Sequence, residues 1–385
     1  MKKKTINHLS LFTGCGGMDI GLRGNFLAFS KFFKDSSKKN KWIYLPETKI
    51  KTIFSNDIKK ESYKFWMKNF SIKENSKSVF KLGSVVDLVK EEKKSKNIFP
   101  KNIDIVTGGF PCQDFSVSGL RGGFNSHKSH LNDFNVLKKN ETRGNLYLWM
   151  KEVINITKPK IFIAENVKGL ISKKEAFELI KKDFEYSGIP YKLFTKELYA
   201  PDYGIPQSRR RIFFVGVNRN FIKKKDIKIN ENDLFPDIEF TKTNYPKAKY
   251  FFLNLKEPHK EKEDLSQMYY SKAKLTKGSQ GQTEVNENGI APTIRSEHHG
   301  NIEFRYLNKS NKGKNKNPHN YQRRLTVREC ARIQTFPDDL DFIFDINKKE
   351  GISASAAYKL IGDAVPPLLA YKFGLKIEKF LTKYL

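Results

Sequence analysis

The sequence predicts an open α/β sheet in a large domain, joined to a second, smaller domain of short strands and irregular segments. Two observations predict this class. Up to residue 216, apolar segments rich in β-branched residues recur, and several end in glycine or polar residues before a helical pattern begins. From residue 217 the pattern weakens into charged and asparagine-rich stretches. We therefore expect residues 1–216 and 346–385 to form the large domain and residues 217–345 the smaller one.

Composition excludes several classes of protein. With 385 residues and 38% hydrophobic content, the chain can bury a large core. No apolar run reaches membrane-spanning length and no signal-peptide pattern follows the lysine-rich start, so we expect a cytoplasmic protein without membrane contact. Cys15, Cys112 and Cys330 lie far apart without a paired motif, which argues against disulfides and against a metal site.

The charge of the chain favours a polyanionic partner. The formal net charge is +30, which is enough to attract nucleic acid and to make the association depend strongly on salt. Most of the 72 basic residues are lysine, however, and abundant lysine can also reflect an AT-rich genome. Specific contacts are therefore expected from the arginines, since a guanidinium forks onto phosphates and bases.

Residues 8–22 predict a short strand, a glycine turn and a helix. Gly14, Gly16 and Gly17 let the backbone pass close to a ligand, and the amino end of the helix offers free N–H groups. A glycine turn of this kind occurs in nucleotide-binding folds and also in plain turns. Cys15 is expected to be a small residue that fills the turn.

A nucleotide-binding sheet also needs an acidic side chain at the end of its second strand, where it accepts hydrogen bonds from ribose hydroxyls. Asp57 ends the strand predicted over residues 52–57. Its distance from the glycine turn is about twice the ~20 residues usual for dinucleotide folds. The lysine-rich residues 24–51 account for the excess, and we interpret them as a surface insertion.

A cysteine follows the next predicted strand, at residues 103–106. Gly108 and Gly109 allow a sharp bend there, and Pro111 fixes the backbone before Cys112. Because ligands bind at the carboxyl ends of the strands in open α/β sheets, the thiol is presented to a site. The alternative for a lone cysteine is a small buried hydrophobic residue.

Two later strands add ionisable side chains at the same edge. The strand over residues 159–167 ends with Glu165, and residues 203–216 lead into a strand through Gln207, Arg209 and Arg211. These three side chains alternate along an extended segment and so share one face, as expected for a pocket that grips an anionic substrate. A solvated basic surface is the alternative.

The smaller domain is expected to contain short alternating strands such as residues 249–255. Residues 278–283 and 291–300 are rich in groups that can read base edges, although ordinary polar loops would look similar. Thr326 and Glu329 then form a capping box at a helix start, with Cys330 among the apolar positions. A helix over residues 354–361 should stop at Gly362, and a second helix should start at the following prolines.

Six of these motifs together resemble those of the DNA (cytosine-5)-methyltransferases of bacterial restriction–modification systems, in the same order and over nearly the whole chain. The resemblance rests on Phe-x-Gly-x-Gly-Gly at 12–17, Gly-Gly-Phe-Pro-Cys-Gln at 108–113, Glu-Asn-Val at 165–167, Gln-x-Arg-x-Arg at 207–211 and Gly-Asp-Ala-Val-Pro-Pro at 362–367, with Gly-Ser at 83–84 in place of the family's Gly-Asp. It implies a Rossmann-like, S-adenosylmethionine-dependent methyltransferase sheet and a target-recognition domain.

The resemblance also assigns roles to residues. It implies Cys112, Glu165, Arg209 and Arg211 as catalytic residues, with Arg211 on the cytosine O2 and Arg209 stabilising the adduct. S-adenosylmethionine would lie against Phe12, Gly14, Gly16, Gly17, Asp57, Ile58, Ser84, Pro111, Leu146, Asp363 and Ala364. DNA would contact Gln113, Ser116, Arg121, Gln207, Gln280, Gln282, Thr293, Arg295 and His298.

The chemistry asks for the same residue types. Carbon 5 of cytosine is a poor nucleophile, so a thiolate must first add to carbon 6 of a base flipped out of the duplex. A carboxyl group whose pKa is raised by burial can share a proton at N3. The expected partners are double-stranded DNA and a cognate restriction endonuclease that acts separately from a monomeric methyltransferase.

The sequence departs from the family pattern at two single positions and in one inserted segment, and two alternative functions remain open. Ser84 stands where the family has Asp, and Asp363 stands where the family more often has Asn. Residues 127–139 look inserted relative to the family. A transfer-RNA-methylating relative would need a Cys-Phe-Thr signature, but no cysteine lies between Cys112 and Cys330. A catalytically silent nucleic-acid-binding module on this fold is the other alternative, against which the intact Cys112 and Glu165 argue.

Overall fold

A computed structural model describes residues 5–33, 42–70, 79–95, 97–111, 146–270, 282–296, 302–306, 322–346, 348 and 350–384. Its centre is an eight-stranded sheet with the strand order β5-β4-β1-β6-β7-β10-β9-β8. The first five of these strands are parallel, and the last three are joined to them by antiparallel pairing. The strands are β1 (Ile6–Leu11), β4 (Ile50–Asp57), β5 (Val79–Leu82), β6 (Ile105–Gly109), β7 (Ile161–Val167), β8 (Tyr186–Ser187), β9 (Ile189–Tyr199) and β10 (Arg210–Asn218).

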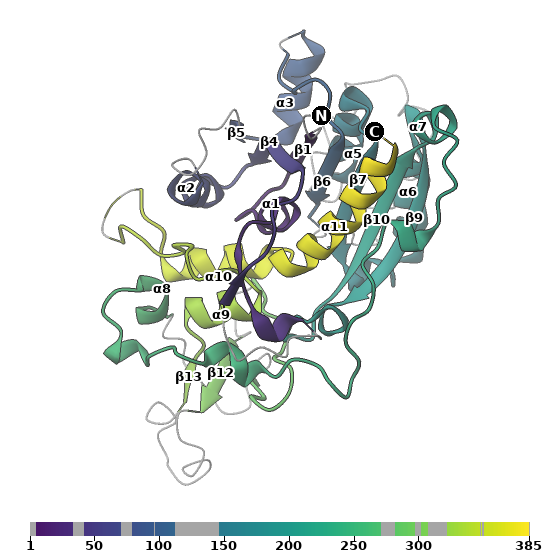
Figure 1. Ribbon diagram of the computed structural model, residues 1–385. Coiled ribbons are helices and arrows are strands. Elements are labelled where there is room, and N and C mark those ends of the chain that lie inside the picture. The colour runs from purple at the N-terminus through teal and green to yellow at the C-terminus, as the bar shows by residue number, and fades with distance from the viewer. Residues whose placement is uncertain are drawn as a thin grey trace.

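Helices cover both faces of this sheet (Figure 1). Alternate residues of each strand point to opposite faces, so Ile161 and Ile163 join one hydrophobic core while Phe162 and Ala164 join the other. The α1 and α11 helices pack against each other on the first face, and α3, α5 and α6 cover the second. With α2 and α10 included, these helices are α1 (Gly17–Arg23), α2 (Lys60–Asn69), α3 (Val85–Lys93), α5 (Leu146–Thr157), α6 (Lys174–Glu185), α10 (Ala354–Asp363) and α11 (Pro367–Tyr384).

The chain between α1 and β4 differs from the surface insertion expected over residues 24–51. It forms a hairpin of β2 (Leu27–Phe29) and β3 (Trp42–Tyr44) and a short 3-10 helix, η1 (Ser30–Phe32). Phe26, Phe29 and Phe32 are buried in the main core, and Phe32 stacks on Phe251 with ring centroids 4.7 Å apart. The many lysines in this segment suggested an exposed surface, so the sequence pattern did not predict that these aromatic residues are buried.

The elements that follow β10 lie partly against the large sheet. The α7 helix (Arg219–Lys224) contacts β9 and β10, and η6 (Glu231–Asp233) contacts α11. The strand expected over residues 249–255 is wrong, because that segment forms the 3-10 helix η7 (Ala248–Phe252). Its Phe251 packs on Phe29 of β2 and Phe32 of η1. The 3-10 helix therefore buries the apolar side chain that the alternating pattern had assigned to a strand. Other short helices are η4 (Lys168–Leu170), η5 (Ala200–Tyr203) and η8 (Pro258–Lys260).

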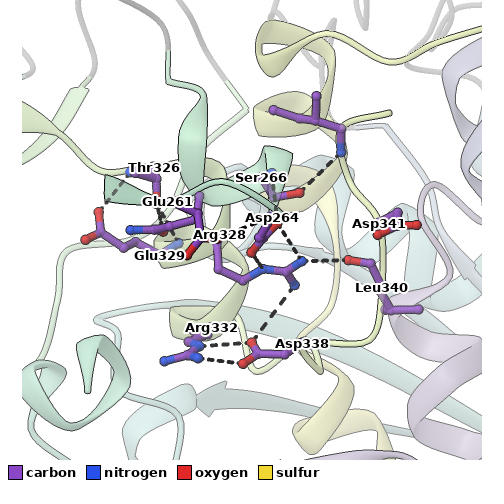
Figure 2. Close-up of polar contacts among 12 residues, drawn as sticks. Glu261, Asp264, Ser266, Thr326, Arg328, Glu329, Arg332, Asp338, Leu340 and Asp341 are labelled. Atoms are coloured by element: carbon purple, nitrogen blue, oxygen red, sulfur yellow. Dashed lines mark hydrogen bonds and ion pairs between the residues drawn. The ribbon is translucent and has the colours of Figure 1, made fainter. Parts of the chain in front are cut away.

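A second, three-stranded sheet lies apart from the first, in the order β11 (Gln282–Glu284), β12 (Ile302–Tyr306) and β13 (Gln322–Arg324). The α9 helix (Val327–Ile333) follows it and begins with the expected capping box. Figure 2 shows how two arginines of α9 fasten this region together. The Arg328 Nε lies 2.6 Å from Asp264, just before α8 (Leu265–Met268), and its Nη2 donates to the Leu340 carbonyl at 3.0 Å.

Two further expectations concern the C-terminal helices. The α10 helix continues through Gly362 to Asp363 instead of stopping at residue 361, and α11 starts at Pro367 as expected. Within the described part of the chain, no helix is long and apolar enough to cross a membrane.

Candidate active site

The carboxyl ends of β6 and β7 lie side by side and bring the expected catalytic segments together. Gly109 of β6 is the register partner of Glu165 in β7, and Phe110 and Pro111 follow directly. Cys112 lies outside the described residues, and so do the DNA-contact candidates Gln113, Ser116, Arg121, Gln280 and His298; of Gln282 only the backbone is described. The general acid candidate Glu165 is therefore paired with Gly109, which precedes Cys112 by three positions in the sequence.

Glu165 is a buried carboxyl group with a cationic neighbour. Its side chain is 9% exposed, and the Arg211 Nε lies 2.9 Å from its Oε1. The pair is at ion-pair distance but lacks the alignment of a full hydrogen bond at this oxygen. Burial raises the pKa of Glu165, and Arg211 and Arg209 act in the opposite direction. The site can therefore hold a proton on Glu165 more readily than an exposed carboxylate would.

Gly108 and Gly109 do not form the sharp bend expected from the sequence; they let neighbouring side chains approach the strand. Both lie within strand β6. A Cβ at Gly109 would lie 3.1 Å from the Glu165 Oε2, and one at Gly108 would lie 2.8 Å from the Met150 sulfur. The strand needs glycine here so that the acid and the helix behind it can approach the backbone.

Asn166 is a positioning residue that the sequence pattern contained but did not single out. Its Nδ2 donates to the Phe110 carbonyl at 2.9 Å, and its Oδ1 accepts from the backbone N–H of Val167 at 2.8 Å. The amide thus ties the end of β7 to the residue before Pro111. Its place directly after Glu165 was the available signal.

Arg209 does not point at the Glu165 carboxyl as a second substrate-binding cation. Its guanidinium is buried and donates to three carbonyls, those of Ile294 at 3.0 Å, Gly362 at 3.0 Å and Ala364 at 2.8 Å. Burial lowers its pKa to about 9, so it stays protonated at neutral pH. In this conformation Arg209 joins β10 to the end of α10 and to the segment that carries Arg295.

Gln207 was expected to contact DNA, but the structure places it in the interior. Its side chain has no exposed surface, its Nε2 donates to Gln334, and its Oε1 accepts from the backbone N–H of Ile294. The alternation predicted over 207–211 is present, because positions 207 and 209 are buried while Ser208 and Arg210 are exposed. The inward side chains are used for internal contacts, and only Arg211 reaches Glu165.

The glycine turn at the end of β1 leaves open space on its outer side. Gly14 and Gly16 adopt left-handed φ angles of 57° and 72°, and Phe12 adopts 53°. A Cβ at Gly14 would meet no atom within 4 Å, whereas one at Gly17 would overlap the Val365 carbonyl oxygen. The turn is therefore open at Gly14 and tightly packed at Gly17, where α1 meets the start of α11.

Asp57 ends β4 as expected, and its carboxylate holds the turns around it. Its Oδ2 accepts from the Gly14 N–H and its Oδ1 from the Lys59 N–H, each at 2.8 Å. Burial raises its pKa, opposed by these two backbone hydrogen bonds. Ile58 beside it is 68% exposed, which leaves an apolar side chain free to contact a ligand.

The remaining cofactor candidates line the same edge. Ser84 caps α3, where its hydroxyl accepts from the Val86 N–H at 3.2 Å. Asp363 forms an ion pair with the Lys59 Nζ at 2.7 Å, and the Ala364 carbonyl accepts from Arg209. Leu146 is half-buried at the start of α5. An open glycine turn, a buried carboxylate and an exposed Ile58 fit a nucleoside cofactor with an apolar portion.

Fold and site together define an α/β enzyme with a nucleotide-type cofactor edge and a buried acid beside it. The family model for C-5 cytosine-specific DNA methylase matches residues 6–379. The chain belongs to this family, and it is a DNA (cytosine-5)-methyltransferase.

Curated relatives agree with this assignment. Type II methyltransferase M.BsuRI of Bacillus subtilis is 30% identical over 99% of this chain and 81% of its own length. Type II methyltransferase M.FnuDI of Fusobacterium nucleatum is 29% identical over 97% and 94%. Among solved structures, the S. pombe Dnmt2 methyltransferase has a TM-score of 0.59 at 16% identity, covering 97% of this chain and 99% of that one. The Entamoeba histolytica methyltransferase EhMeth has a TM-score of 0.58, also at 16% identity, covering 99% of both chains, and both structures share the fold.

Proposed function

We propose that this methyltransferase modifies a flipped-out cytosine within a specific short sequence of double-stranded DNA, and that it protects host DNA from a restriction endonuclease that acts separately. The observation that carries the chemistry is the buried Glu165, paired in register with Gly109 and contacted by Arg211. The relatives named as Type II methyltransferases support the protective role. A monomer is expected to carry out the reaction.

The protein's residues divide the work around the cytosine ring. The Cys112 thiolate adds to carbon 6, and its attack becomes easier as N3 gains a proton. Glu165 is the group that shares that proton, because burial raises the pKa of its carboxyl. Arg211 contacts Glu165 from β10 and is exposed enough, at 16%, to reach the cytosine O2. Once carbon 5 has gained the methyl group, loss of the carbon 5 proton restores the ring double bond and releases the cysteine as a thiolate.

S-adenosylmethionine supplies an electrophilic methyl group when it is bound. The ends of β1, β4 and β6 would hold it, with Asp57 as the acceptor for ribose hydroxyls and Ile58 as an exposed apolar contact. Ser84 and Asp363 replace the residues that the family more often has, so the contacts there are this chain's own. The other proposed contacts are Phe12, Gly14, Gly16, Gly17, Pro111, Leu146 and Ala364.

We further propose that sequence recognition belongs to the smaller domain. The three-stranded sheet and the segment around Arg295 support this assignment. Because α7 contacts β9 and β10 and η6 contacts α11, we propose that the smaller domain starts later than residue 217. Arg295 is the leading candidate for reading a base, since a guanidinium binds guanine O6 and N7 together. The other proposed DNA contacts are Gln113, Ser116, Arg121, Gln280, Gln282, Thr293 and His298, with Gln207 reassigned to positioning.

The test is to express the protein in cells without cytosine methylation and to sequence their DNA with detection of 5-methylcytosine. We expect methylation confined to one short sequence, and none with Cys112→Ser. Genomic DNA methylated in this way should resist one restriction endonuclease of matching specificity. Methylation without sequence preference would contradict the proposed function, and so would methylation of transfer RNA in place of DNA.

A further inference from the structure

A buried carboxylate lies directly beneath the proposed base-reading arginine. Glu303, on the central strand β12, is 2% exposed, and its Oε1 has no hydrogen-bond partner. The nearest cation is Arg295, whose Nε lies 3.9 Å from that oxygen, and the Arg295 side chain is 41% exposed. A buried carboxylate oxygen without a hydrogen-bond partner is costly, so its presence here needs an explanation other than stability.

The main chain at Arg295 is held on two sides by groups of the catalytic domain. The Ile294 N–H donates to Gln207 at 3.2 Å, and the Ile294 carbonyl accepts from Arg209 at 3.0 Å. Gly362 packs so closely that a Cβ there would overlap the Arg295 backbone. The position of the Arg295 Cα is thereby fixed relative to Glu165, and the freedom that remains lies in the long side chain.

The groups around Glu303 leave it available to Arg295. Arg324 on β13 also faces it, but this guanidinium lies over the Tyr358 ring, 3.8 Å from its centroid. Cys330 on α9 is the other titratable neighbour, and burial keeps its pKa well above the usual range, so it stays a neutral thiol. Glu329 is a second buried carboxylate nearby, and it accepts hydrogen bonds from Arg305 and Arg323.

We propose that Glu303 is a positioning residue for DNA recognition, holding the Nε side of the Arg295 guanidinium so that the two terminal nitrogens face outward as a fork. This inference rests on the proposed role of Arg295 in base reading. Preorganising a long side chain removes part of the ordering cost of binding and favours bidentate contact with guanine over contact with other bases. Among the described residues, the carboxylate of Glu303 is the acidic group that contacts Arg295.

A pH dependence follows from the surroundings of Glu303. Burial raises the pKa of Glu303 to about 7, opposed by Arg295 and Arg324. Burial keeps Cys330 a neutral thiol across this range, so Glu303 is the group beside Arg295 whose charge changes. Discrimination between bases should therefore be greatest above about pH 7 and should weaken as the carboxylate is protonated below it.

The experiment compares Glu303→Gln, Arg295→Ala and the double variant with the wild-type protein. Competition binding is measured from pH 6 to pH 8.5 with the methylated DNA sequence and with duplexes carrying one substitution each. Glu257→Gln is the matched control, because it removes a carboxylate from the buried Arg323 in the same domain without touching Arg295. Thermal unfolding of each variant is followed alongside.

We expect Glu303→Gln and Arg295→Ala to lose roughly tenfold discrimination at the same base position, with no further loss in the double variant. Wild-type discrimination should fall below about pH 7, and that of Glu303→Gln should not change with pH. Glu303→Asp, which keeps the charge, should restore part of the discrimination even where Glu303→Gln folds poorly.

Two results separate the possible failures. If Glu303→Gln keeps full discrimination while Arg295→Ala loses it, Arg295 reads the base without help and the positioning role is wrong. If Arg295→Ala weakens binding to every duplex equally, Arg295 contacts the DNA backbone, and the proposed base-reading role fails together with this inference.

Discussion

Glu165 shows how a single residue acquires a reactive state from its surroundings. A carboxyl group at the end of a strand is ordinarily solvated, but this one is buried between β6 and β10 with Arg211 beside it. Burial disfavours the charged form and so raises the pKa of the carboxyl, while Arg211 acts in the opposite direction. A raised pKa favours the proton sharing that activation of a cytosine ring requires.

Replacing Glu165 by Gln should therefore reduce methyl transfer. The amide keeps the shape but cannot exchange the proton, so we expect single-turnover rates to fall roughly 10²- to 10⁴-fold. S-adenosylmethionine affinity should stay the same within error. Glu197→Gln, at an exposed ion pair with Arg210, is the control and should leave the rate unchanged. An unaltered rate in Glu165→Gln would remove the acid from the mechanism.

Asp19 is a second buried acid, and it affects stability. It accepts hydrogen bonds from Ser10 and Ser55 beneath the glycine turn, and burial raises its pKa to about 6. A folded-state pKa above the unfolded value means that the native protein binds the proton more tightly. Its contribution is therefore most favourable below about pH 4 and is lost as the pH rises through 6.

The Asp19→Asn variant should reveal this dependence. Relative to wild type, its free energy of unfolding should increase by up to about 3 kcal/mol as the pH rises from 4 to 7, because a shift of about two pKa units corresponds to that energy. Chemical denaturation across this pH range measures the difference. A constant difference between the two proteins over the range would show that Asp19 titrates normally.

At the level of elements, the close packing of α1 on α11 fixes the glycine turn. These two helices form the most extensive helix pair on their face of the sheet, and Gly17 and Gly21 lie in the contact. A Cβ at Gly17 would overlap the Val365 carbonyl oxygen, and that oxygen belongs to rigid backbone. The C-terminal motif is thereby held next to the turn, although more than 300 residues separate the two in sequence.

Gly17→Ala should consequently force these helices apart. We expect a loss of about 1 to 3 kcal/mol in the free energy of unfolding, the usual cost of overpacking, together with weaker S-adenosylmethionine binding. Gly169→Ala is the control, since the nearest atom to its Cβ would be 4.0 Å away. Calorimetry gives both quantities. Equal stability for the two variants would mean that the contact at Gly17 relaxes without cost.

Single elements also show what the sequence could predict. The strands that lead to Asp57, Gly109 and Val167 and the capping box at Thr326 were predictable, because continuous apolar runs and capping residues are local signals. The hairpin of β2 and β3 was not, since its short strands lie among lysines and its burial depends on contact with Phe251, far away in the chain.

At the scale of the whole molecule, the sheet order could be predicted only through family resemblance. Residue types at the strand ends indicated a site, but their contacts depend on which strands become neighbours. Arg209 and Gln207 illustrate this: their alternation was predictable, whereas the carbonyls of Ile294 and Gly362 that Arg209 meets come from distant segments. The sequence therefore indicated which residues lie at these positions, but not which groups each of them contacts.

The same long-range contacts connect catalysis to recognition. Arg209 holds a carbonyl of the Arg295 segment and two carbonyls at the end of α10, while β10 carries Arg211 to Glu165. One strand thus links the acid, the cofactor edge and the proposed base-reading arginine. We infer that Cys112, which follows Gly109 by three positions in the sequence, forms a covalent bond with the target cytosine.

Covalent trapping tests that claim most directly. Duplex DNA with 5-fluorocytosine at the target lacks the proton whose loss would release the cysteine, so the adduct should persist. With S-adenosylmethionine present, we expect the wild-type protein to form a complex that survives denaturant, and we expect none from Cys112→Ser. A trapped complex in Cys112→Ser, or none in an active wild-type protein, would show that Cys112 is not the nucleophile.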